Sequence, residues 1–259
     1  MLRRNPDAAR GEIRVIPVPL ADEILPGDDL VKKLAAALKH QKLKLHSHDI
    51  VVLKHKIVSK AEGQVVGLNT VRPSPAAKAW SRKTGTDARV IELALSESKR
   101  IVRKRKGVLI TETRHGLICA NSGVDVSNVD GGESAVLLPK DPDASAANLR
   151  TKLMRRFRSN IAVIISDSFG RPWREGLTEV AIGVAGIKSI VDYRGRRDAH
   201  GYPLHASYEA VADEVACAAG LVCGKLNRTP VAIVRGFAFQ SGRGSARELI
   251  RAARNDLFR

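Results

Sequence analysis

The pattern of hydrophobic positions predicts several buried strands. An apolar run rich in β-branched residues and without polar alternation occupies Ile161–Ile165 (IAVII). Val231–Arg235 (VAIVR) is similar up to its final arginine, and Asp49–Lys60 (DIVVLKHKIVSK) has such a run after its first residue. Such runs are typical of strands that are buried in a sheet. Glu12–Pro19 (EIRVIPVP) alternates with a period of two, which also predicts a strand.

Helices are predicted between these strands. Leu30, Leu34 and Leu38 recur at helical spacing after a pair of aspartates that can cap the first turn. Further helices are predicted at Arg89–Arg105, Ala146–Phe157 and Ser207–Leu226 and at a last segment that ends near Glu248, and a strand pair is predicted at Gly107–Thr111 and Leu117–Ala120. Because strands and helices are mixed without an internal repeat, we predict a mixed α/β class (α/β or α+β) in one domain, residues 1–259.

Targeting signals are missing from the sequence. No apolar run reaches the length that crosses a membrane, and the first residues lack the apolar stretch of a signal peptide. Cys119, Cys217 and Cys223 are odd in number and lack metal-ligand spacing, which favours reduced thiols. We therefore expect a cytoplasmic protein without membrane association.

The formal net charge of +17 predicts an anionic partner. Nucleic acid is one candidate, and nucleotides or phosphorylated substrates are another. Aromatic residues make up only 4% of the chain, which is poor material for stacking single-stranded bases, and no nucleic-acid-binding motif is visible. Nucleic acid is therefore the less favoured partner, although charge alone does not choose.

A carboxylate follows the strand Ile161–Ile165. Asp167 stands beside Ser168, and Arg171 and Arg174 come next, in a segment whose glycine and proline are expected to end the regular structure. Hard cations take oxygen ligands and arginine matches phosphoryl oxygens, so the segment suits a metal ion bound to phosphate. An aspartate that only caps the next turn, with surface arginines beyond it, explains the segment equally well.

A second polar loop favours the interpretation that a metal ion binds near Asp167. Asp125 and Asn128 lie in an oxygen-rich loop that follows the strand Leu117–Ala120, and the loop does not have the pattern of an EF-hand. Lys60 precedes a glycine-containing loop at the predicted end of a strand, where it can reach a phosphate. Asp125 and Asp167 are therefore a candidate pair of metal ligands.

Signatures of the common nucleotide and hydrolase sites are missing. There is no G-x-x-x-x-G-K-[ST] sequence and no G-x-S-x-G sequence, and the short glycine clusters at Gly183–Gly186 and Gly242–Gly244 do not make a dinucleotide fingerprint. His115, His200 and His205 lack the spacing of zinc ligands. The fold is therefore expected to be neither of the P-loop nor of the Rossmann type.

Four segments together resemble the coenzyme F420-0:L-glutamate ligase family, also called the gamma-glutamyl ligases of the deazaflavin coenzyme. They are DIVVLKHKIVSKAEG, HGLICANSGVDVSN, LLPKDPDASA and ISDSFGRPWREGLTEVAIGVAG, in the family's order. The resemblance implies a GTP-dependent ligase that adds L-glutamate to the lactyl phosphodiester end of F420-0 and a second glutamate through a γ-linkage, with release of GDP and phosphate. It also implies a two-lobed α/β fold and a homodimer. Some relatives carry a further C-terminal flavin-dependent domain, which is not expected in this chain.

The resemblance also assigns roles to individual residues. The divalent-metal ligands match Asp125, Asp167 and Ser168, with Mg²⁺ or Mn²⁺ as the ion, and the resemblance leaves open whether K⁺ assists. The catalytic contribution is expected mainly from Asp167, Asp125 and Lys60. The nucleotide contacts match Ala21, Asp22, Glu23, Ile24, His55, Lys60, Asn128, Cys223, Gly224, Lys225, Leu226, Asn227, Arg228, Thr229 and Pro230.

Two positions depart from the family's pattern. His55 stands where many members have serine, and Lys225 stands where some archaeal members have a metal-binding glutamine. A lysine has no acceptor atom, so Lys225 is expected to supply charge to a phosphate and not to bind a metal. Two alternative functions remain at this point: a metal-dependent phosphohydrolase that uses the same aspartates, and a basic nucleic-acid-binding protein.

Overall fold

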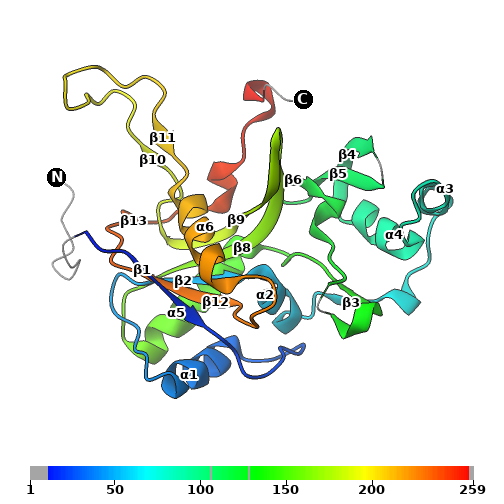
Figure 1. Cartoon of the computed structure of the whole chain (residues 1–259), viewed down its shortest axis with the longest axis horizontal. Helices are drawn as coiled ribbons and strands as arrows, with labels where there is room; N and C mark the ends of the chain where they lie inside the picture. The colour runs from blue at the N-terminus through cyan, green and yellow to red at the C-terminus, as the bar shows by residue number, and fades with distance from the viewer. Residues whose placement is uncertain (1–10, 106, 128, 257–259) are drawn as a thin grey trace.

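A computed structural model describes residues 11–105, 107–127 and 129–256 of the chain. Its centre is a six-stranded sheet with the strand order β1-β12-β2-β8-β9-β13 (Figure 1). These strands are β1 (Arg14–Val18), β12 (Val231–Arg235), β2 (Ile50–Lys54), β8 (Ala162–Arg171), β9 (Arg174–Ile187) and β13 (Ser241–Gly242). Strands β2 and β8 run parallel, and the other neighbours are antiparallel.

Helices cover the two faces of this sheet (Figure 1). They are α1 (Leu30–His40), α2 (His55–Ala61) and α5 (Pro142–Phe157) on one face and α6 (Val211–Cys223) on the other. Alternate residues of one strand therefore enter different cores: Val51 and Leu53 pack with α1 and α5, while Ile50 and Val52 pack with α6. This burial on both sides explains why the β2 run shows no polar alternation. Mixed α/β architecture, as predicted from the sequence, is confirmed.

A second group of elements lies to one side of the sheet, at the right of Figure 1. It consists of β3 (Val65–Gly67), α3 (Pro75–Thr84), α4 (Ala88–Ser96), β4 (Ser98–Arg105), β5 (Val108–Thr113), β6 (Ile118–Ala120) and β7 (Ser134–Val136). The group has a hydrophobic core of its own, in which Leu68, Ile91 and Leu109 are buried. Within the described residues, no helix is both long and apolar enough to span a bilayer.

The remaining elements are short. Strands β10 (Val191–Asp192) and β11 (Tyr208–Glu209) form a hairpin that projects from the body in Figure 1. Short 3-10 helices occupy Leu68–Thr70, Asn121–Gly123, Asp130–Gly132, Ala246–Leu249 and Ala253–Asn255. The helix predicted to end near Glu248 is therefore only one 3-10 turn.

The helix predicted at Arg89–Arg105 is wrong in its second half. Helix α4 ends at Ser96, and the basic run continues as strand β4, which pairs with β5. An extended edge strand places the basic side chains of β4 in solvent, where they discourage pairing with another chain. The helical spacing of hydrophobic residues is genuine in α4, but the prediction continued the helix into a basic run that has no such spacing.

Two further boundaries differ from the prediction and both matter for the site. The segment Asp49–Lys60 is a strand only to Lys54 and then turns into helix α2, whose β-branched Ile57 and Val58 are buried in the core. Strand β8 does not end with the apolar run at Ile165 but continues to Arg171 as one arm of a long hairpin with β9. Tertiary pairing with β9 overrides the low strand propensity of this polar segment.

Candidate functional site

A pocket of about 920 Å³ opens between the central sheet and the second group of elements. Strand β2 ends at Lys54, which lies opposite Ser166 in the neighbouring parallel strand β8. The carboxyl end of β2 and the polar half of β8 therefore meet at the pocket. In open α/β sheets ligands commonly bind outside the carboxyl ends of the strands.

Asp167 faces the pocket from β8. A bulge in the pairing of β8 with β9 falls between Ile165 and Ser166, at the point where apolar residues give way to polar ones. One carboxylate oxygen, Oδ1, accepts a hydrogen bond from the Ser168 N–H at 2.7 Å and lies 3.3 Å from Nε2 of the buried His55. Bulges re-aim side chains next to binding sites, and here the bulge precedes the candidate metal ligand. His55 thus fixes the orientation of the carboxylate.

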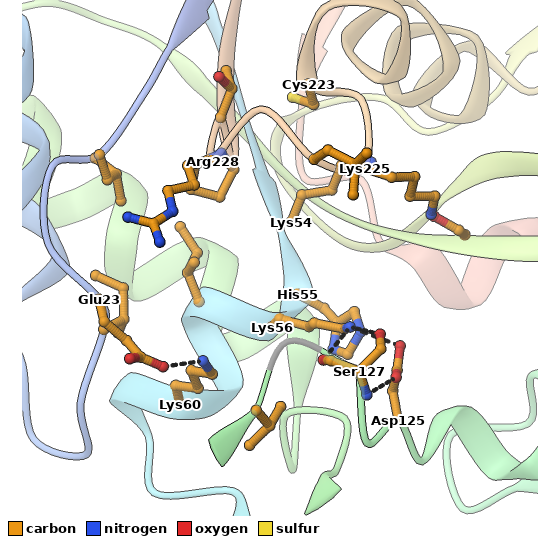
Figure 2. Close-up of a pocket in the computed structure, with 18 of the residues that line it drawn as sticks. Glu23, Lys54, His55, Lys56, Lys60, Asp125, Ser127, Cys223, Lys225 and Arg228 are labelled. Carbon is orange, nitrogen blue, oxygen red and sulfur yellow. Dashed lines mark hydrogen bonds and ion pairs between the residues drawn. The ribbon is translucent and has the colours of Figure 1, made fainter. Parts of the chain in front are cut away.

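Asp125 reaches the same pocket from the second group of elements. Its backbone pairs with Val136, and its Oδ1 accepts a hydrogen bond from the Ser127 N–H. The ammonium of Lys56 lies 2.7 Å from Oδ2 and also donates to Ser127, as Figure 2 shows. Burial would raise the pKa of Asp125, but the hydrogen bonds from Lys56 and Ser127 outweigh it and hold this pKa below its ordinary value. The carboxylate is therefore ionised at neutral pH.

Lys60 lines the pocket from helix α2 and not from a strand end, as the sequence had suggested. Its side chain is only 11% exposed, and its ammonium donates to Oε1 of Glu23 at 2.8 Å (Figure 2). This bond and the charge of Lys60 lower the pKa of Glu23, although Glu23 is largely exposed. Because the Glu23 side chain is solvated, an anionic ligand can take its place at Lys60 at small cost.

Sequence reasoning missed Glu179, the most buried carboxylate of the site. It lies on β9 opposite Ser168, and the hydroxyls of Ser166 and Ser168 donate to it at 2.9 and 2.7 Å. The Lys54 ammonium forms an ion pair with it. Burial would raise the pKa of Glu179, but the bonds from Lys54 and Ser168 lower it overall. Glu179 could be found only from its pairing with Ser168 across β8 and β9, and the sequence analysis placed Ser168 beyond the predicted strand Ile161–Ile165.

Most of the predicted nucleotide contacts line this one pocket. They are Ala21, Asp22, Glu23, Ile24, His55, Lys60, Cys223, Gly224, Lys225, Leu226, Arg228, Thr229 and Pro230. Asn227 is not among the lining residues; its carbonyl accepts the hydroxyl of Thr229 within the loop. Asn128 lies outside the described residues. Segments from the beginning, middle and end of the chain thus converge on one cavity.

The donor chemistry of the pocket fits a hard divalent cation. Asp125 and Asp167 both line it, and carboxylate oxygens are the ligands that Mg²⁺ and Mn²⁺ prefer. No preassembled group of three or more His, Cys, Asp or Glu side chains is found in the described part of the chain. Ser168 fits less well, because its hydroxyl donates to Glu179 and accepts from Lys225.

The three cysteines are predicted to react slowly in the folded protein. Burial, assisted by the charge of Asp167, raises the pKa of Cys119 to about 12, and burial also raises the pKa of Cys217 and Cys223. Since the thiolate is the reactive form, alkylation by iodoacetamide at pH 8 should be at least about tenfold slower in native protein than in protein unfolded by guanidinium. Mass spectrometry of timed samples measures both rates. Equal rates would contradict the burial of these thiols.

The pocket has the composition of a site for a small, charged molecule, and its segments lie in a part of the chain that matches a known family. The model of the F420-0:Gamma-glutamyl ligase family matches residues 20–236. The chain belongs to this family. The match includes every pocket segment described above, so the geometry belongs to the part of the chain that the family shares.

Three relatives cover most of the chain. It is similar to the coenzyme F420:L-glutamate ligase of Methanopyrus kandleri, with 41% identity over 252 residues, which are 95% of this chain and 98% of the relative. The protein of the same name from Methanothermobacter thermautotrophicus is 43% identical over 236 residues, 90% of this chain and 93% of the relative. That of Methanocaldococcus jannaschii is 42% identical over 212 residues, 82% and 84% of the two chains.

Proposed function

We propose that this protein is a GTP-dependent ligase that joins L-glutamate to coenzyme F420-0 and releases GDP and phosphate. The observation that carries the proposal is the convergence of Asp125, Asp167 and Lys60, from three separate segments, on one pocket. Relatives of 41% and 43% identity are named for the ligation of L-glutamate to coenzyme F420. GTP as the energy source rests on the resemblance of the four sequence segments.

The reaction needs an activated carboxylate. Near neutral pH an amine and a carboxylic acid exchange a proton and form a salt instead of an amide. In the proposed first step a carboxylate oxygen of F420-0 attacks the terminal phosphorus of GTP, and the bond to the leaving GDP breaks. In the second step the glutamate amine attacks the acyl carbon of the resulting acyl phosphate. Phosphate leaves with the bridging oxygen, and the nitrogen loses a proton.

The residues of the pocket divide this task. Asp125 and Asp167 would hold Mg²⁺ or Mn²⁺, which when bound neutralises phosphate charge. Lys60 would exchange the exposed Glu23 for a phosphate oxygen, and His55 keeps the carboxylate of Asp167 in place. Positioned charge of this kind stabilises the transition state more than it stabilises the substrates, which is the requirement for catalysis.

The positive charge of the chain supports the same proposal. GTP, F420-0 and glutamate are all anions, so a basic surface raises their rate of encounter with the pocket. This attraction is screened by salt. We also propose that the protein acts in the cytoplasm and that it forms a homodimer. Light scattering of the purified protein would test the homodimer.

Release of GDP is the measurement that tests the proposal. The protein is incubated with GTP and Mg²⁺ or Mn²⁺, and F420-0 and L-glutamate are added singly and together. The expected result is release that requires both substrates, with a product that is heavier by one or more glutamate residues in mass spectrometry. Release without glutamate would indicate a phosphohydrolase or an uncoupled first step, and absence of release under all combinations would reject the proposed ligase.

A further inference from the structure

Glu179 is a buried carboxylate that the proposed reaction does not use. Its side chain is 8% exposed, and it receives hydrogen bonds from the hydroxyls of Ser166 and Ser168 and the ion pair from Lys54. Burying an ionised group is expensive unless it is paired and hydrogen-bonded, and these partners meet that requirement. Because its burial is costly and its partners line the pocket, a function of this carboxylate in ligand binding is favoured.

A chain of hydrogen bonds connects Glu179 to a second lysine. Ser168 donates to Oε1 of Glu179 at 2.7 Å and accepts from the ammonium of Lys225 at 2.5 Å. Lys225 lies in the loop after α6, and Figure 2 shows its side chain extending away from this loop, on the side opposite Arg228. The Ser168 hydroxyl thus donates its proton to Glu179 and accepts from Lys225, which fixes the direction of Lys225 although this side chain is exposed.

The cluster carries more positive than negative charge. Lys54 and Lys225 supply two ammonium groups, and Glu179 supplies one carboxylate, which faces Lys54 and the two serines. Both lysines line the pocket. An ammonium has three donors, so each retains capacity for a ligand oxygen beyond the bond described here. The excess charge is therefore available to an anion in the pocket.

We propose that Lys54 and Lys225, positioned by Glu179 and Ser168, form an oxyanion subsite for the terminal phosphoryl group of the nucleotide. The inference rests on the proposed function. A terminal phosphate has three free oxygens and carries close to two negative charges at neutral pH, so it can accept hydrogen bonds from both ammonium groups at once. The phosphodiester of F420-0 has only two free oxygens and carries one charge. The subsite also lies beside Asp167, because the Ser168 N–H donates to that carboxylate.

Affinity for a triphosphate relative to a diphosphate measures this subsite. A non-hydrolysable GTP analogue and GDP are titrated into the full-length protein with Mg²⁺ by calorimetry. We expect Lys225→Met and Lys54→Met each to lower the affinity for the analogue roughly tenfold, because a charge-assisted contact to phosphate is lost, and to change the affinity for GDP less than about twofold. The exposed Lys152→Met on α5, which lies outside the pocket, is the matched control and should change neither value.

Glu179 is a positioning residue in this proposal. Its variant therefore needs a measurement that distinguishes positioning of the lysines from a merely structural role. Glu179→Gln keeps the shape of the side chain and should lower the affinity for the analogue about as much as Lys225→Met does. In the double variant the two losses should not add, because both act through the same hydrogen-bonded chain. A merely structural role would instead give additive losses and weaken the binding of GDP equally. Thermal unfolding of each variant confirms that the fold is retained.

The outcomes separate this inference from the function on which it rests. If the unmodified protein binds neither the analogue nor GDP, the proposed nucleotide-dependent function fails. If it binds both and the lysine variants lower both affinities equally, or neither, the terminal phosphoryl subsite is rejected and the ligase proposal stands. A loss confined to the binding of F420-0, titrated in parallel, would also reject the subsite, since it would assign the lysines to the acceptor's phosphodiester.

Discussion

Replacing Asp167 by asparagine is expected to lower the rate of glutamate ligation by about 10²–10³-fold, the usual loss when one charged contact to a transition state is removed. Asparagine has nearly the same shape and can still accept the hydrogen bond from the Ser168 N–H. It lacks the negative charge that would hold a divalent cation, and the charge that faces His55. The effect should therefore fall on chemistry and on metal affinity and leave the fold intact.

Two measurements distinguish this effect from damage to the structure. The rate is followed as GDP release with both substrates present, and binding of Mn²⁺ is followed by electron paramagnetic resonance. Asp192→Asn is the matched control, because Asp192 is an aspartate on the projecting hairpin that is paired with Arg194 and lies outside the pocket. If Asp167→Asn retained more than about one tenth of the rate, Asp167 would not be the central charge of the site.

The central strands of this protein could be predicted because a strand that is buried on both faces has a continuous apolar sequence. Runs such as Ile161–Ile165 and the first four residues of β12 are apolar at every position, since α1 and α5 cover one face of the sheet and α6 covers the other. The basic segment of β4 has no such apolar run. Its strand conformation depends on pairing with β5, and a pattern of charges cannot reveal this partner.

The candidate site divides in a similar way. Asp125 and Asp167 could be predicted because each is a carboxylate that follows an apolar strand, and the structure brings both to one pocket. The residues with which they share the site could be predicted only in part. Lys56 becomes a partner of Asp125 only because α2 starts at His55, where the sequence suggested a continuing strand. Glu179 requires the β8–β9 hairpin, whose register a single sequence does not show.

Truncation of Ile233 to alanine is expected to cost roughly 2–5 kcal/mol of the free energy of unfolding, the range observed for large-to-small substitutions in cores. Ile233 is fully buried at the middle of β12, between Ile16 of β1 and Val51 of β2. Its side chain belongs to the core that joins the sheet to α1 and α5. A sheet that is held from both sides has little freedom to collapse into the cavity, which favours the upper half of this range.

Ile13→Ala is the matched control, because the same atoms are removed just before β1, where the side chain is 53% exposed. Its cost should stay within about 0.5 kcal/mol. Urea unfolding followed by far-ultraviolet circular dichroism compares the two variants with the unmodified protein. The urea concentration at the midpoint of unfolding should decrease strongly for Ile233→Ala and hardly at all for Ile13→Ala. Equal shifts would contradict the burial of Ile233 in the core between the sheet and the helices α1 and α5.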